Sequence, residues 1–130
     1  MTRPSIDLGA TVLGAKDARA LAAFYQDLLG WEITEDKPDW IELPAPGGGA
    51  GLSFQTEANH VPPVWPTSEH EQQMMMHLDI AVSSLDEATA SAVALGASLA
   101  PWQPQDDVRV MIDPAGHPFC LYEPGHIGGQ

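Results

Sequence analysis

The side chains with the greatest chemical versatility lie in the second half of the chain, in the segments HLDIAV and HPFCLYE. The first segment supplies the imidazole of His77 and the carboxylate of Asp79, and the second supplies the thiol of Cys120. An imidazole can act as a general base or bind a metal ion, and a thiolate can bind zinc or attack a substrate. Because Cys120 is the only cysteine, an intramolecular disulfide and a cluster of several thiolates are excluded. A buried, unreactive thiol is the alternative interpretation of Cys120.

Two similar series of elements must position these groups. A helix is predicted from the N-cap Asp17 to Gly30, and a second helix, with Leu85 on its apolar face, ends at Gly96. Apolar and β-branched segments predict strands at residues 6–13, 31–34, 40–43, 51–55, 74–82, 98–100, 108–112 and 118–122. The order of strand, helix and three strands therefore occurs twice, with a period of about 65 residues.

This repeat predicts an α+β fold made of two βαβββ modules, at residues 6–56 and 74–123. The proline-rich segment 57–73 is predicted to be a linker or a lid, and residues 124–130 a frayed tail. One domain of 130 residues can bury a core without disulfides.

Alternation along each strand predicts which side chains share a face. The face toward the helices is predicted to include Met76, Leu78 and Ile80, with Val108, Val110 and Ile112, and with Phe119 and Leu121. The opposite face is predicted to carry Trp40, Glu42, Ser53, Gln55, Met75, His77, Asp79, Arg109, Met111, Cys120 and Tyr122. Aromatic and sulfur-containing groups mixed with a few polar ones are typical of a small-molecule cavity. The alternative is the solvated face of an antiparallel sheet.

Two tryptophans in proline-rich loops, Trp65 and Trp102, either close this cavity over a ligand or fill gaps in the core. Arg109 could pair with a carboxylate of a ligand, or it could neutralise nearby acidic side chains such as Asp79 and Asp106. We therefore predict a ligand site formed by Trp40, Gln55, Trp65, His77, Asp79, Trp102, Arg109, Met111, Cys120 and Tyr122.

The charge balance limits the class of partner. The chain has 5 Lys and Arg against 18 Asp and Glu, a formal net charge of -13. Nucleic acids and anionic lipids require clustered cations, so neither is an expected partner. No apolar run is long enough to span a membrane, and the first residues do not resemble a secretory signal. The predicted location is the cytoplasm, with a mature secreted form as the alternative.

The segments DARALAAFYQDLLGWE, HLDIAVSSLDEA and DPAGHPFCLYE together resemble the glyoxalase/bleomycin-resistance/dioxygenase superfamily, which has the vicinal oxygen chelate fold. The resemblance extends over residues 8–123. It implies two βαβββ modules whose sheets curl around one cavity, and a homodimer.

The resemblance also implies positions for a divalent metal, on the first and last strands of each module. These positions correspond to Ala10, to Gln55 or Ser53, to His77 and to Cys120. Alanine has no donor atom, and cysteine stands where the family usually has glutamate. We therefore expect no resident metal; if one binds, its ligands are Gln55, His77 and Cys120. Asp79 would either orient His77 or simply hydrogen-bond to it.

Three functions follow as hypotheses. The first is a non-catalytic binder of a hydrophobic or aromatic small molecule, as resistance proteins of the superfamily are. The second is an enzyme: a metal-dependent lyase, isomerase or dioxygenase, or a metal-free enzyme that uses His77 as a base. The third is a domain that acts through dimerisation alone.

Overall fold

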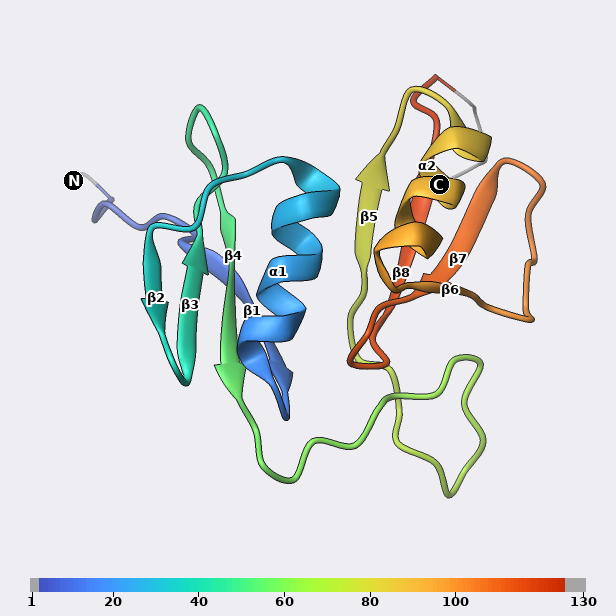
Figure 1. Ribbon diagram of the computed structural model, residues 1–130, viewed down its shortest axis with the longest axis horizontal. Coiled ribbons are helices and arrows are strands. Elements are labelled where there is room, and N and C mark those ends of the chain that lie inside the picture. Colours follow the sequence, from blue (N-terminus) through green and yellow to red (C-terminus); the bar gives the residue numbers. More distant parts are fainter. Residues whose placement is uncertain (1–2, 126–130) are drawn as a thin grey trace. The chain divides into compact units, whose positions relative to one another are not determined.

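A computed structural model of the chain describes residues 3–125 (Figure 1). The chain divides into two compact units, Met1–Ala58 and Asn59–Gln130, and each contains one βαβββ series. Their boundary falls inside the predicted linker, and residues 126–130 of the predicted tail lie outside the described part. Within residues 3–125, no helix is long and apolar enough to cross a lipid bilayer.

The first unit is a four-stranded sheet covered by one helix. Its elements are β1 (Ala10–Ala15), α1 (Ala18–Leu29), β2 (Glu35–Lys37), β3 (Trp40–Leu43) and β4 (Gly51–Thr56). The strand order is β1-β4-β3-β2, with β1 parallel to β4 and the other pairs antiparallel. Tyr25 of α1 is fully buried and stacks on Phe54 of β4, with ring centroids 5.8 Å apart. The apolar stripe of α1 therefore closes the core on one face of this sheet.

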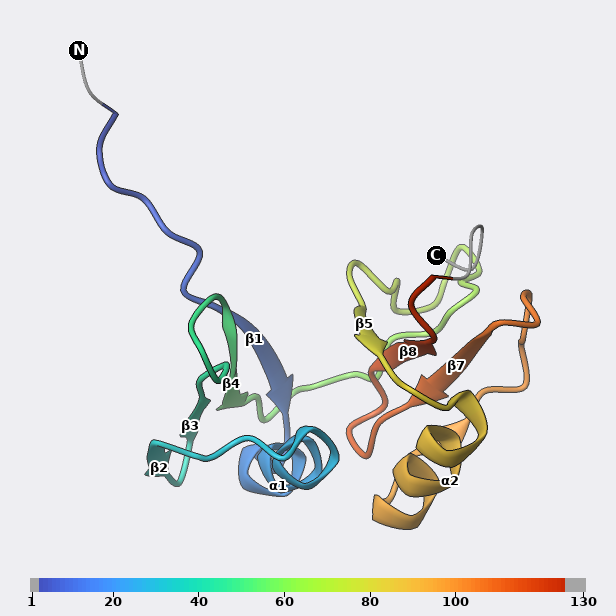
Figure 2. The same ribbon diagram turned by 90° about the horizontal axis from the view of Figure 1, so that it is seen from above.

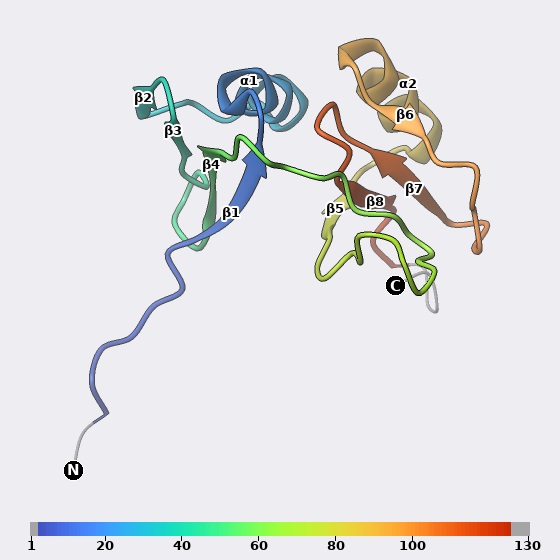
Figure 3. The ribbon, with the colours of Figure 1, turned by 90° about the horizontal axis from the view of Figure 1, so that it is seen from below.

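The second unit repeats this arrangement. Its elements are β5 (Leu78–Ala81), α2 (Leu85–Leu95), β6 (Ser98–Leu99), β7 (Val108–Ile112) and β8 (Pro118–Tyr122), in the strand order β5-β8-β7-β6. The backbone N–H of Leu85 donates to the Glu123 carboxylate at 2.7 Å, which ties the start of α2 to the end of β8. Figures 2 and 3 show that α2 covers one face of this sheet, whereas the segment preceding β5 runs along the other.

The first helix begins and ends where the sequence predicts, and the second ends at the predicted glycine. The Asp17 side chain accepts a hydrogen bond from the Ala20 N–H at 3.1 Å, and the Ser84 hydroxyl accepts one from the Glu87 N–H at 3.3 Å. Gly30 ends α1 with a left-handed backbone at φ 72°, and Gly96 ends α2 at φ 121°. The predicted α+β fold of two βαβββ modules is confirmed.

Five predicted strands have different bounds, although β4 differs only by the addition of Thr56. The first begins at Ala10, and the exposed residues 6–9 precede it. The strand predicted at 31–34 was wrong: the turn at Pro38 and Asp39 pairs Lys37 with Trp40, so the strand that pairs with β3 is Glu35–Lys37. The prediction of residues 98–100 is shortened to Ser98–Leu99.

The strand predicted at 74–82 is also shorter, since β5 begins at Leu78. Its partner β8 begins at Pro118, which has no N–H to continue the ladder beyond the pairing of Leu78 with Phe119. Met76 was predicted to face the helices, but it is 77% exposed, because it lies in the unpaired stretch before β5.

The turn between β7 and β8 depends on an aspartate and a glycine. Asp113 is buried, and its Oδ1 accepts hydrogen bonds from the backbone N–H groups of Ala115 and His117, at 2.9 and 3.0 Å. Gly116 has φ 92°, and a Cβ there would overlap the ring of Pro62, which packs on the turn. His60 adds a contact, with its Nε2 2.8 Å from the carbonyl oxygen of Ala115. The segment preceding β5 is thereby anchored to the turn.

Replacing Gly116 with alanine should destabilise the protein through two separate effects. The left-handed backbone costs roughly 1–3 kcal/mol for a residue with a Cβ, and displacing Pro62 costs roughly 1–3 kcal/mol more. Gly30→Ala is the matched control, because Gly30 also has positive φ but nothing lies near its missing Cβ. Denaturant unfolding should show a larger loss in the free energy of unfolding for Gly116→Ala than for Gly30→Ala. Equal losses would contradict the packing of Pro62 on the turn.

Candidate functional site

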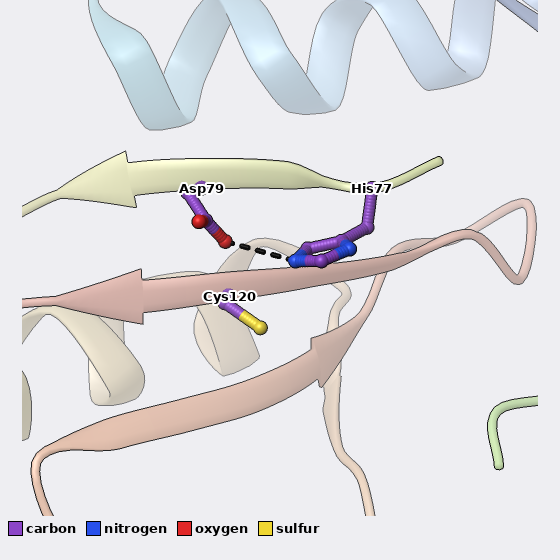
Figure 4. A group of neighbouring side chains, drawn as sticks. All are labelled: His77, Asp79 and Cys120. Atoms are coloured by element: carbon purple, nitrogen blue, oxygen red, sulfur yellow. Dashed lines mark ion pairs between the residues drawn. The ribbon is translucent and has the colours of Figure 1, made fainter. Parts of the chain in front are cut away.

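Three potentially reactive side chains meet at the parallel pair β5 and β8 (Figure 4). The strand register sets Asp79 opposite Cys120, and His77 lies two residues before Asp79, just ahead of β5. His77 Nε2 lies 3.0 Å from Asp79 Oδ1, and ligand atoms of the three residues all lie within 4.8 Å of one another. The prediction that His77, Asp79 and Cys120 share a face is confirmed.

These residues line a pocket of about 390 Å³, within the range of volumes typical of small-molecule sites. The pocket lies entirely within the second unit. Its lining residues are Trp65, His77, Asp79, Trp102, Pro104, Gln105, Val108, Val110, Cys120 and Tyr122. Six of the ten residues predicted for the ligand site are among them: Trp65, His77, Asp79, Trp102, Cys120 and Tyr122.

Two tryptophan rings form one wall of the pocket. Trp65 stacks on the His77 imidazole, with ring centroids 4.8 Å apart and an interplanar angle of 30°. Trp102 meets Trp65 edge-on, with centroids 4.9 Å apart. Both indoles pack against the small apolar cluster that includes Val110 and Cys120. Each tryptophan therefore borders the pocket and packs in the core. Closure of either tryptophan over a ligand stays a prediction.

The loops that carry these tryptophans are fixed by local hydrogen bonds. Trp65 follows Val64, whose N–H donates to the carbonyl oxygen of Gln72 at 2.8 Å and closes the loop. The amide of Gln103, next to Trp102, donates to the carbonyl oxygen of Val110 at 2.8 Å and accepts from the N–H of the same residue at 2.9 Å. Gln103 thus replaces a strand partner for β7. The sequence gives no signal for this role, because nothing in it distinguishes a glutamine that bonds to a strand from a solvent-exposed glutamine in a loop.

The predicted orientation of β7 was wrong. Val110 is opposite Cys120 and Val108 is opposite Tyr122, so both valines share the pocket face. Met111 is opposite Phe119 and is fully buried on the other face. Both faces of β7 carry apolar residues, so alternation alone could not tell them apart.

Arg109 lies on the same face of β7 as Met111, and neither residue lines the pocket. The Arg109 guanidinium donates to the carbonyl oxygens of Asp106 and Val108, at 2.8 and 3.1 Å. The prediction that Arg109 pairs with a ligand carboxylate in this pocket was therefore wrong.

The two remaining predicted ligand residues, Trp40 and Gln55, belong to the first unit. They are opposite each other in the β3–β4 register. The Trp40 indole donates to Glu42 at 2.7 Å, and the Gln55 amide donates to Glu57 at 2.9 Å. Their part in a ligand site stays a prediction.

The strand registers also identify equivalent positions in the two units. Val12 is opposite Ser53 in the first unit, as Asp79 is opposite Cys120 in the second. A single shift along the sequence relates Val12 to Asp79 and Ser53 to Cys120. The same shift relates Ala10 to His77. Ser53, and not Gln55, is therefore the counterpart of Cys120. The four positions implied for a metal do not form a conventional set, because Ala10 has no donor atom.

The chemistry of Cys120 is set by its surroundings. Burial, and secondarily the negative charge of Asp79, raise the pKa of the Cys120 thiol to about 11. The thiolate is the nucleophilic form, so Cys120 is protonated and unreactive near neutral pH. This supports the interpretation of Cys120 as a buried, unreactive thiol.

Alkylation by iodoacetamide tests this assignment on the protein's single cysteine. A rise in pKa from 9.0 to about 11 lowers the thiolate fraction, and we expect a reaction at pH 7.5 about a hundredfold slower than in urea-unfolded protein. Asp79→Asn should speed the reaction, because it removes a charge that opposes ionisation. A rate that reaches its plateau below pH 9 would contradict the assignment.

Comparison with known proteins agrees with the fold and the repeat. A family model described as a glyoxalase-like domain matches residues 6–122. No curated protein matches the chain in sequence.

Solved structures share the fold at low sequence identity. A glyoxalase/bleomycin resistance protein/dioxygenase family enzyme from Burkholderia phytofirmans is 22% identical, with a TM-score of 0.68 over 91% of this chain and 98% of that one. A lactoylglutathione lyase from Agrobacterium tumefaciens is 18% identical, with a TM-score of 0.62 over 98% and 100% of the two chains. A fosfomycin resistance protein from Listeria monocytogenes, complexed with Mn(II), is 19% identical, with a TM-score of 0.68 over 92% and 93%. The chain belongs to the glyoxalase-like domain family.

Proposed function

We propose that this protein binds a hydrophobic or aromatic small molecule in the pocket of the second unit, without catalysing a reaction. The observation that carries the proposal is the composition of the pocket wall. Two tryptophans, a tyrosine and two valines line the pocket, together with the polar pair His77 and Asp79 and the amide of Gln105. Apolar walls with a few convergent polar groups favour a ligand held by stacking and oriented by one or two hydrogen bonds.

A binding role also agrees with the state of the polar groups. His77 is already engaged with Asp79 and stacked on Trp65. The Cys120 thiol is protonated at neutral pH because its pKa is about 11. Such groups suit hydrogen bonding and packing against a ligand better than nucleophilic attack. A cytoplasmic location and a homodimer remain expectations from the sequence and from the family resemblance.

The neutral dye N-phenyl-1-naphthylamine tests the proposed binding, since its emission rises when it enters an apolar site. We expect saturable binding that Trp102→Ala weakens about tenfold, because a stacking surface is lost, and that His77→Ala weakens about fivefold. Trp31→Ala is the matched control, because Trp31 follows Gly30 at the end of α1 in the first unit and does not line the pocket. Comparable weakening by Trp31→Ala and Trp102→Ala would contradict binding in this pocket.

A metal-dependent enzyme is the second candidate function, and one observation favours it. His77, Asp79 and Cys120 could offer a nitrogen, an oxygen and a sulfur donor to one ion, a set that zinc accepts. Asp79 would then take the place predicted for Gln55. A metal would, however, have to displace the proton of a thiol whose pKa is raised, which lowers the apparent affinity.

Elemental analysis separates the two candidates. We expect the purified protein to carry much less than one equivalent of zinc, nickel, manganese or iron, and His77→Ala to weaken dye binding without any loss of metal. Near-stoichiometric metal that disappears in both His77→Ala and Cys120→Ala would contradict the binding proposal and support the enzyme.

A further inference from the structure

The pocket has an uneven charge. Among the described residues that line it there is no lysine or arginine, while Asp79 contributes a carboxylate. The Asp79 side chain is 47% exposed and the His77 side chain 27% exposed, so both can reach a ligand in the pocket. A ligand that enters therefore meets a negative group without a neighbouring lysine or arginine.

Three of the five lysines and arginines have partners outside the pocket. Arg109 is the only lysine or arginine in residues 59–130. Its side chain lies on the face of β7 away from the pocket, where the guanidinium donates to the backbone carbonyl oxygens of Asp106 and Val108. In the first unit, Arg19 pairs with Asp36 at 2.9 Å and Lys37 with Glu35 at 3.5 Å. Within the second unit, His77 is the partner of Asp79.

The hydrogen-bonding groups of the pair favour a donor on the ligand. In a neutral imidazole one nitrogen carries the proton, and the contact with Asp79 requires that this be Nε2. The other nitrogen, Nδ1, then has a free lone pair. The second carboxylate oxygen of Asp79 is likewise an acceptor. The pair therefore presents electron-rich atoms to a ligand, which can accept a hydrogen bond from a protonated amine or attract a quaternary cation that has no N–H.

The aromatic side chains of the pocket favour a positively charged ligand. The ring faces of tryptophan and tyrosine are electron-rich and attract cations within about 6 Å of the ring centre. Trp65, Trp102 and Tyr122 all border the pocket beside Asp79. A planar cation can stack on such rings and approach the carboxylate at the same time.

We propose that the pocket selects planar aromatic ligands that carry a positive charge, such as a quaternary or protonated aromatic amine, over neutral and anionic ligands of the same shape. This inference rests on the proposed binding function and specifies its ligand class.

Three probes of one ring system test the selectivity: N-methylquinolinium, quinoline and quinoline-2-carboxylate, titrated calorimetrically at pH 8 and low ionic strength. We expect the cation to bind about tenfold more tightly than quinoline, and the anion to bind most weakly. Raising the salt concentration should narrow the difference in affinity between the cation and the anion, because salt screens their interaction with Asp79.

Asp79→Asn locates the source of the selectivity. Asparagine keeps an oxygen that can accept from His77 Nε2 but carries no charge, so the affinity ratio of cation to quinoline should fall from about tenfold to about threefold. Asp106→Asn is the matched control, because it makes the same change in net charge at an exposed residue outside this pocket. It should leave the ratio unchanged.

Each failure has a separate meaning. Equal binding of all three probes, or preference for the anion, would overturn the charge selectivity while the proposed binding function stands. An equal fall in the ratio for Asp106→Asn and Asp79→Asn would assign the effect to net charge and overturn the role of the pocket. No binding of any probe at millimolar concentration would contradict the binding function itself.

Discussion

The site depends on the parallel pairing of β5 with β8. This register sets Asp79 opposite Cys120 and brings His77 to the edge of the same face. Parallel strands need a crossover, and here α2 provides the first part of it, fastened to the end of β8 by Glu123. The face opposite α2 is then left for the segment that carries Trp65, which the Asp113 turn anchors through Pro62 and His60. This pairing thus positions the polar pair, while the Asp113 turn and Gln103 hold the aromatic wall on the same face.

Much of the fold could be predicted from the sequence, because local chemistry determines its parts. Asp17 and Gly30 define one helix, and the matched glycine Gly96 defines the end of the other. Strand ends were less predictable, since they depend on partners distant in sequence. Pro118 shortens β5, and the turn at Pro38 places β2 later in the sequence than predicted, but neither effect is visible in the apolar pattern of the strand concerned.

The site was predictable in part, for a related reason. Where polar and apolar residues alternate, as around His77 and Asp79, the face follows from the sequence. In β7 the neighbours Val110 and Met111 are both apolar, so only the pairing with β8 shows that Val110 borders the pocket. The same pairing turns Arg109 away from the pocket, so the one cation that could have paired there with a ligand carboxylate does not line it. Pro104 and Gln105 join the pocket through loop geometry that Gln103 fixes.

We propose that the His77–Asp79 pair and the tryptophans beside it form a small-molecule site in the second unit. Nuclear magnetic resonance of isotope-labelled protein, titrated with N-methylquinolinium, tests it most directly. We expect the neutral His77 ring to carry its proton on Nε2 before N-methylquinolinium is added. During the titration, the shift changes should be concentrated at His77, Trp65, Trp102 and Tyr122. Shift changes confined to the first unit, around Trp40 and Gln55, would contradict it.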